Sequence, residues 1–465
     1  MNTADKFARL AALRPAAGVV RNAELRPPEE EDAVARLLGA GVARNEFGEH
    51  LTIRNWFSTP EFAEPSGTVL ELLTRGTQKR ANGRGKKLAD LKIGHYRDAR
   101  SAASDLDDPA KWLFLDTETT GLAGGTGTYA FLVGLAWWDA GGLQVEQLFL
   151  RDFSEERSLL QELAARIAER PVLVTFNGKS FDWPLLENRF TMTRKIAVPR
   201  LAAHLDLLHP SRALWKMRLG SVRLVELERR VLDAARLGWH REDDVASALI
   251  PQYYFDYLRG GTATPLAGVV KHNQMDLRGL AALFGKINSL LDERGAAQEE
   301  ADSRDLFGLS RFLQRRGENG RAQTACTKAL DAGLPVEYRP QATRDLALMA
   351  KRRGDFEEAA ELWRELAHDA QDGIAACEEL AMHYERRAKD YALAVEFTEL
   401  GLTKATRSRK LSREPYWAAR AARWEEKFMC RLARLRHRIG KEENAPRAPL
   451  LAQAAAAGAK TRGTR

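Results

Sequence analysis

The feature that most constrains the fold of this chain is a change in hydrophobic periodicity near residue 176. Before it, short apolar or alternating runs predict strands around one helical run. Beyond it, the periodicity is mostly helical as far as residue 291. The expected strands cover residues 112–115, 129–138, 143–150 and 172–176, and the helical run covers 155–169. Strands and helices in this order predict an α/β domain over residues 111–291.

From about residue 303 the chain is almost wholly helical and repeats itself. Each repeat is expected to form two helices that bury a face against the next repeat, with a small residue where they cross. The equivalent segments are 314–330 with Ala322, 350–366 with Ala359, and 386–402 with Ala394. This pattern predicts tetratricopeptide-like helical repeats over residues 303–440, whose concave surface is a candidate site for a protein partner.

The other segments are interpreted from their composition. Residues 1–50 mix charged and Ala-rich stretches and are expected to be weakly structured. Residues 51–110 form an N-terminal segment with a basic loop at 75–87. That loop either guides nucleic acid through contacts to phosphates or is simply solvated. The low-complexity tail at 441–465 is expected to be disordered.

Composition excludes some classes of protein. Of the 465 residues, 44% are hydrophobic and 29% are charged, which allows a sizeable core and argues against wholesale disorder. The net charge of +8 is compatible with a polyanionic partner without identifying one. No apolar run approaches the roughly 18 residues of a membrane span. The cysteines, Cys326, Cys377 and Cys430, suit neither a zinc cluster nor a disulfide framework, so a cytoplasmic location is expected.

A pair of carboxylates follows directly on the first expected strand. Asp116 and Glu118 are two residues apart, so in a strand their side chains project from the same face. Two like charges held side by side repel each other unless a cation lies between them. Hard divalent ions such as Mg²⁺ and Mn²⁺ prefer carboxylate oxygens. The alternative is an ordinary polar exit from a strand into a turn.

Two later segments carry further candidate ligands. Asn177 and Asp182 follow the strand at 172–176, although both could be simple caps. His272 and Asp276 are four residues apart and would share one face of a helix, where a lone histidine is more often structural. The order Asp-x-Glu, Asn-x-x-x-Phe-Asp and His-x-x-x-Asp argues against chance.

Together these segments resemble the Exo I, Exo II and Exo III motifs of the DEDD 3′–5′ exonucleases, which have the ribonuclease H-like fold. The runs at 204–232 and 243–261 are similar to those of the bacterial YprB-like proteins, which pair such a domain with C-terminal tetratricopeptide-like repeats. The resemblance covers residues 111–291 well and the repeats loosely. It implies a mixed sheet flanked by helices, followed by an all-α repeat domain.

The resemblance implies roles for four carboxylates and one histidine. Asp116, Glu118, Asp182 and Asp276 match the family's acidic ligands of two Mg²⁺ or Mn²⁺ ions, with Asp116 shared between the ions. His272 falls where the family places the Tyr or His that orients or deprotonates the attacking water. Its spacing to Asp276 is that of the Tyr subclass, so its role as a base stays open.

Four residues are expected to contact substrate. Asn177 and Phe181 match the second motif and would shape a pocket for the terminal nucleotide. Thr117 lies between Asp116 and Glu118 and is also expected to contact substrate. Lys179 either meets a phosphate or is a solvated surface lysine.

Several neighbouring residues are open to a plainer interpretation. Asp206 either orients a metal ligand or caps a helix. Asp243 and Asp244 are interpreted as a solvated helix start. The tryptophans, Trp112, Trp137 and Trp138, are interpreted as core.

The function expected from these features is metal-dependent 3′–5′ exonuclease activity on single-stranded DNA or RNA ends. The rival hypothesis is a non-catalytic adaptor that keeps the fold to bind nucleic acid and recruits a protein through its repeats. A surface made only for binding gains nothing from clustered negative charge that faces phosphates, which favours the enzyme.

Overall fold

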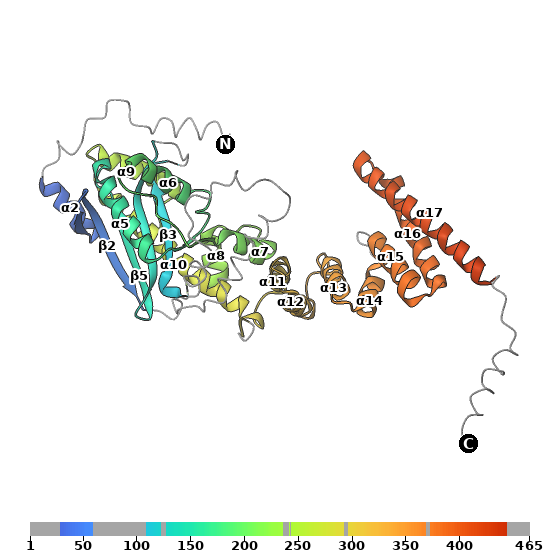
Figure 1. Cartoon of the computed structure of the whole chain (residues 1–465). Coiled ribbons are helices and arrows are strands. Elements are labelled where there is room, and N and C mark those ends of the chain that lie inside the picture. Colours follow the sequence, from blue (N-terminus) through green and yellow to red (C-terminus); the bar gives the residue numbers. More distant parts are fainter. Residues whose placement is uncertain are drawn as a thin grey trace, which may run out of the picture. The chain divides into compact units, whose positions relative to one another are not determined.

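The structure is a computed structural model that describes residues 28–58, 108–121, 127–235, 241, 243–292, 296–368 and 373–443. The chain divides into two compact units, Met1–Glu318 and Asn319–Arg465 (Figure 1). The expected basic loop at 75–87 lies outside the described residues, as do residues 1–27 and the expected disordered tail from residue 444.

Strands of the first unit form one seven-stranded mixed sheet in the order β1-β2-β5-β4-β3-β6-β7. The pairs β1–β2, β2–β5, β5–β4 and β4–β3 are antiparallel, whereas β3–β6 and β6–β7 are parallel. Antiparallel neighbours need only short turns, and parallel neighbours need longer crossovers, which here contain helices. The strands are β1 (Gly41–Asn45), β2 (Gly48–Phe57), β3 (Trp112–Thr119), β4 (Ala130–Asp139), β5 (Gly142–Phe149), β6 (Val172–Thr175) and β7 (Ala203–Asp206).

The helices of the first unit include one long element, α10, which contacts β3, β4 and β5. The rings of Trp112 and Phe114 on β3 pack against Phe284 of α10, with centroids 5.3 and 6.1 Å apart. Alternate residues share one face of a strand, so Asp116 and Glu118 continue along the same face toward the earlier turns of α10. The helices are α2 (Pro28–Leu38), α5 (Glu156–Glu169), α6 (Asp182–Thr193), α7 (Leu208–Leu219), α8 (Leu224–Leu227), α9 (Ile250–Leu258), α10 (Thr264–Leu291) and α11 (Ser303–Arg315).

The strands expected at 112–176 and the helix at 155–169 are confirmed, and the tryptophans expected in the core are buried. The expectation of weak structure for residues 1–50 is wrong for 28–50, which form α2, β1 and the start of β2. Strand β1 is mostly exposed, so its sequence has no alternation of apolar residues that would predict a strand. Its extended conformation comes from backbone pairing with β2. Strand β7 was expected to be helical. It is only four residues long and lies beside β6.

The second unit is helical throughout its described residues, in keeping with the expected α/β domain followed by an all-α region. Consecutive helices pack on each other from α12 to α17, and the expected small residues, Ala322, Ala359 and Ala394, are buried. Whether these pairs are tetratricopeptide-like repeats stays a prediction. The helices are α12 (Asn319–Asp331), α13 (Arg339–Arg353), α14 (Phe356–Leu366), α15 (Gly373–His383), the π-helix η9 (Tyr384–Ala388), α16 (Tyr391–Leu411) and α17 (Pro415–Glu443).

The boundary between the units falls after the first helix of the expected repeat region. Helix α11 packs on α7, where Gly308 approaches the backbone so closely that a Cβ would lie 2.6 Å from the carbonyl oxygens of Ala213 and Leu214. Arg218 of α7 also pairs with Asp305 of α11 at 2.9 Å. The division is therefore at residues 318 and 319 and not at 303. No helix in the described part of the chain combines the length and apolar character that crossing a bilayer requires.

Candidate active site

The candidate site lies at the edge of the sheet where three parallel strands end. Asp116 and Glu118 lie near the end of β3, Asn177 follows β6, and Asp206 is the last residue of β7. The carboxyl ends of parallel strands meet at one edge of a sheet, so residues far apart in the sequence come together there. This topology explains why three separate motifs can build one site.

Asp116 is held by a buried polar chain that reaches across the sheet. The Asn273 amide of α10 donates to Asp116 Oδ2 at 2.8 Å, and Gln147 of β5 donates to Asn273 Oδ1 at 2.8 Å. Gly134 of β4 lies between Asp116 and Gln147 in the strand register. A Cβ there would lie 2.2 Å from Asn273 Oδ1, so only glycine leaves room for the amide. The Asn273 side chain thereby fixes the orientation of Asp116.

Asp182 reaches the site from the start of α6. The hydroxyl of Thr117 donates to Asp182 Oδ1 at 2.5 Å. Asp182 lies close enough to Asp116 and Glu118 for its charge to raise the pKa of both. Beside it, Phe181 is 59% exposed.

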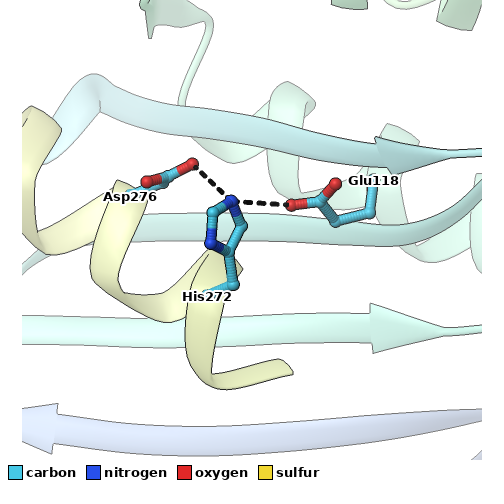
Figure 2. A group of neighbouring side chains, drawn as sticks. All are labelled: Glu118, His272 and Asp276. Carbon is cyan, nitrogen blue, oxygen red and sulfur yellow. Dashed lines mark ion pairs between the residues drawn. The ribbon is translucent and has the colours of Figure 1, made fainter. Parts of the chain in front are cut away.

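His272 lies between two of the expected carboxylate ligands. Its Nε2 is 3.9 Å from Glu118 Oε1 and 3.6 Å from Asp276 Oδ2, and its Nδ1 is 2.7 Å from Asp244 Oδ1. Figure 2 shows one ring nitrogen facing both carboxylates, with His272 and Asp276 on the same helix and Glu118 on a strand. One ligand atom from each of the three residues lies within 4.8 Å of the others, close enough to hold a metal ion.

Arg241 pairs with carboxylates beside this group. It donates to both oxygens of Glu228 at 2.6 and 2.7 Å, to Asp244 Oδ2 at 3.0 Å and to Asp276 Oδ1. Burial opposes the charge on Arg241, but the carboxylates of Glu228 and Asp276 outweigh burial and raise its pKa. Burial raises the pKa of Glu228 to about 7, an effect that Arg241 partly offsets. Asp276 therefore uses one oxygen for Arg241, while the other faces His272.

The carboxylates of the site repel one another. Burial raises the pKa of Asp116 well above its ordinary value, and the charges of Asp276, Asp182 and Glu118 raise it further. The same two causes, burial and then neighbouring carboxylates, raise the pKa of Glu118. Burial also raises the pKa of Asp182, although the bond from Thr117 works in the opposite direction. A divalent cation relieves such repulsion, and these oxygen ligands fit one.

Asp206 organises the loop between β6 and α6. Its side chain accepts from the backbone N–H groups of Asn177 at 2.7 Å, Leu208 at 3.1 Å and Lys179 at 3.3 Å. Asn177 has a φ of 68°, in the left-handed region that Asn tolerates better than most residues. Burial lowers the pKa of Lys179. Its bond to Leu208 lies at the start of α7, as the cap interpretation of Asp206 expects, and its bonds to Asn177 and Lys179 hold the backbone of the loop.

Comparison with known proteins places this site in a family. The model of the RNase_H superfamily matches residues 113–288. Over 330 residues, the chain is 31% identical to "Uncharacterized protein YprB" of Bacillus subtilis (strain 168), which covers 70% of this chain and 74% of YprB. The chain belongs to the same family as YprB, and its residues 113–288 are a domain of the RNase H superfamily. Members of this superfamily are usually nucleases or other hydrolases, and the fold usually binds divalent metal ions.

A solved structure of a family B DNA polymerase from the hyperthermophilic archaeon Pyrobaculum calidifontis is also similar. The match has a TM-score of 0.31 and 15% sequence identity, and it covers 52% of this chain. It covers 29% of the polymerase chain, so this RNase H superfamily member spans less than a third of that protein.

Sequence reasoning missed several residues of the site. Asp244 was interpreted as part of a solvated helix start, but its side chain is 11% exposed and bonds to both His272 and Arg241. Asn273 stood beside His272 in the third motif, and its neighbours alone did not mark it as a partner of Asp116. Arg241 and Glu228 carried no motif at all. Their part in the site can be recognised only from the ion pair that the fold forms between them.

Proposed function

We propose that this RNase H superfamily protein is a metal-dependent 3′–5′ exonuclease that hydrolyses phosphodiester bonds at single-stranded nucleic-acid ends. The observation that carries the proposal is the close group of Glu118, His272 and Asp276 beside Asp116, whose pKa is raised by the surrounding protein and by the neighbouring carboxylates. Partly buried carboxylates that raise one another's pKa are a costly arrangement for a folded protein. Such an arrangement is typical of functional sites.

The carboxylates of Asp116, Glu118, Asp182 and Asp276 would hold two divalent ions, Mg²⁺ or Mn²⁺. Ions bound there would activate a water molecule and stabilise the charge that develops on the leaving oxygen. The protein's own contribution is orientation. Asn273 fixes Asp116, and Thr117 fixes Asp182. We therefore assign Thr117 a positioning role instead of the substrate contact expected from the sequence.

The loop before α6 would receive the end of the nucleic acid. The exposed ring of Phe181 lies next to Asp182 and offers a surface on which a terminal base can stack. The ammonium group of Lys179 would meet a phosphate, and Asn177 would shape the pocket around the terminal nucleotide. The bonds from Asp206 to the backbone of this loop hold it in place before substrate binds.

Labelled oligonucleotides test this proposal with the purified full-length protein. With Mg²⁺ or Mn²⁺, a 5′-labelled single strand should yield a ladder of shortened products, and a 3′-labelled strand should release labelled mononucleotide from the start. Asp116→Asn should abolish both. Asp139→Asn replaces an exposed aspartate at the end of β4 and serves as the matched control, which should keep full activity.

Matched DNA and RNA strands in the same assay would define the substrate class. Products of internal cleavage would contradict an exonuclease. Binding of single strands without metal-dependent cleavage of any DNA or RNA would contradict the enzyme and support the adaptor hypothesis, in which the second unit recruits a protein partner.

A further inference from the structure

The tautomer of His272 follows from its hydrogen bonds. Asp244 is a carboxylate and can only accept a hydrogen bond, so the proton lies on Nδ1 of His272, which donates to it at 2.7 Å. The other oxygen of Asp244 accepts from Arg241 at 3.0 Å, which holds this carboxylate in place. Nε2 therefore presents its lone pair to the site.

That lone pair points at two negative groups. Nε2 is 3.6 Å from Asp276 Oδ2 and 3.9 Å from Glu118 Oε1, both longer than a hydrogen bond. His272 is only 6% exposed, so little water can separate the three atoms. Nε2 of an imidazole that carries its proton on Nδ1 and the two carboxylate oxygens can all act as ligands of one cation placed among them.

The distances suit a shared ion. Metal ions bind imidazole nitrogen and carboxylate oxygen at about 2.0–2.2 Å, so two ligands of one ion lie at most about 4.4 Å apart. Both distances from Nε2 are shorter than this limit. A carboxylate that holds the far nitrogen of a metal-binding imidazole, as Asp244 does here, is the usual support for such a ligand.

We propose that His272 binds a metal ion directly, so that one imidazole and two carboxylates form a site that selects a transition-series divalent ion such as Mn²⁺ over Mg²⁺. This inference rests on the proposed function, because Glu118 and Asp276 are ligands there too. It departs from the role as a base that the exonuclease resemblance implies for this position. Mg²⁺ and Mn²⁺ both suit carboxylate oxygens, but imidazole is a ligand of transition-series ions, and Mn²⁺ is the transition-series member of the pair. A single nitrogen ligand therefore shifts the preference from Mg²⁺ toward Mn²⁺.

Metal binding to the full-length protein, measured without substrate, tests this proposal. After treatment with EDTA and dialysis, the protein is titrated with Mn²⁺ by calorimetry and electron paramagnetic resonance, with Mg²⁺ as competitor. Pulsed resonance should detect a ¹⁴N coupling from one imidazole in the wild type. In His272→Gln this coupling should vanish, and Mn²⁺ affinity should fall by about 10–100-fold while Mg²⁺ affinity changes little.

Two variants separate the ligand from its support. Asp244→Asn should weaken Mn²⁺ binding less than His272→Gln does, because the imidazole remains. His209→Gln and Asp243→Asn replace an exposed histidine and an exposed aspartate of the same unit and should leave Mn²⁺ affinity unchanged. Circular dichroism will check that each variant folds. The ¹⁴N measurement on the wild type tests the ligand role even where a variant fails to fold.

Each result decides one question. A wild type that binds Mn²⁺ without ¹⁴N coupling overturns the ligand role but leaves the proposed nuclease intact. His272→Gln with unchanged Mn²⁺ affinity but lost cleavage would identify His272 as a base. A wild type that binds neither Mn²⁺ nor Mg²⁺ would reject the proposed function itself.

Discussion

Replacing Gly134 with alanine should disturb Asp116 without touching it. A Cβ at residue 134 would lie 2.2 Å from Asn273 Oδ1, whereas ordinary contacts begin at 3.4 Å, so the amide must retreat by about 1.2 Å. Such a shift breaks the 2.8 Å bonds that Asn273 makes to Asp116 and Gln147. The change forces extra volume into a packed region and leaves buried polar groups without partners.

The expected cost is about 2–4 kcal/mol in the free energy of unfolding, from overpacking and from the lost buried hydrogen bonds. A displacement of about 1 Å at a catalytic group is also expected to lower the rate of cleavage by about 100-fold. Urea denaturation measures the first effect, and single-turnover cleavage of a labelled strand measures the second. Gly41→Ala is the matched control, because Gly41 is also a strand glycine and has no atom within 4 Å of its added Cβ.

A double-mutant cycle isolates the cause. In an Asn273→Ala background the amide is gone, so adding Gly134→Ala should cost at least about 1 kcal/mol less than it does in the wild type. Equal costs in the two backgrounds, or a Gly134→Ala variant as stable as wild type, would refute the argument that this glycine exists to admit Asn273.

Three further predictions follow from the charges of the site. Because the fold raises the pKa of Asp116, the metal-free folded state binds more protons than the unfolded state above about pH 4. Its free energy of unfolding should therefore fall as the pH rises toward neutrality. Thermal melts in EDTA should show this trend, and Asp116→Asn should weaken it. Arg241→Ala leaves Glu228 buried without its partner and should cost about 3–5 kcal/mol in urea denaturation, whereas a cost below about 1 kcal/mol would argue against the pairing. Asp206→Ala removes the acceptor for three backbone N–H groups and should cost about 2–3 kcal/mol and lower cleavage, while Asp206→Asn, which keeps one acceptor oxygen, should cost less.

The sequence alone determined where the central strands lie and which carboxylates end them. An apolar run such as 112–115 predicts a buried strand, because burying apolar side chains is favourable in any fold. Asp116 and Glu118 share a face because side chains alternate along a strand. Local rules of this kind need no knowledge of the rest of the chain. They also placed His272 and Asp276 on one helical face, as α10 confirms.

Only the tertiary structure decided which side chains hold those residues in place. Gln147, Asn273 and Asp116 come from β5, α10 and β3, and nothing local to any of them predicts that they meet. Arg241 and Asp244 lie in a segment with no regular pattern, and their role appears only once α10 packs beside it. Strand β1 is likewise ordered by its neighbour β2 and has no apolar pattern of its own. Hydrogen bonds and ion pairs between distant segments depend on where the chain returns in space, and periodicity along the sequence carries no record of that.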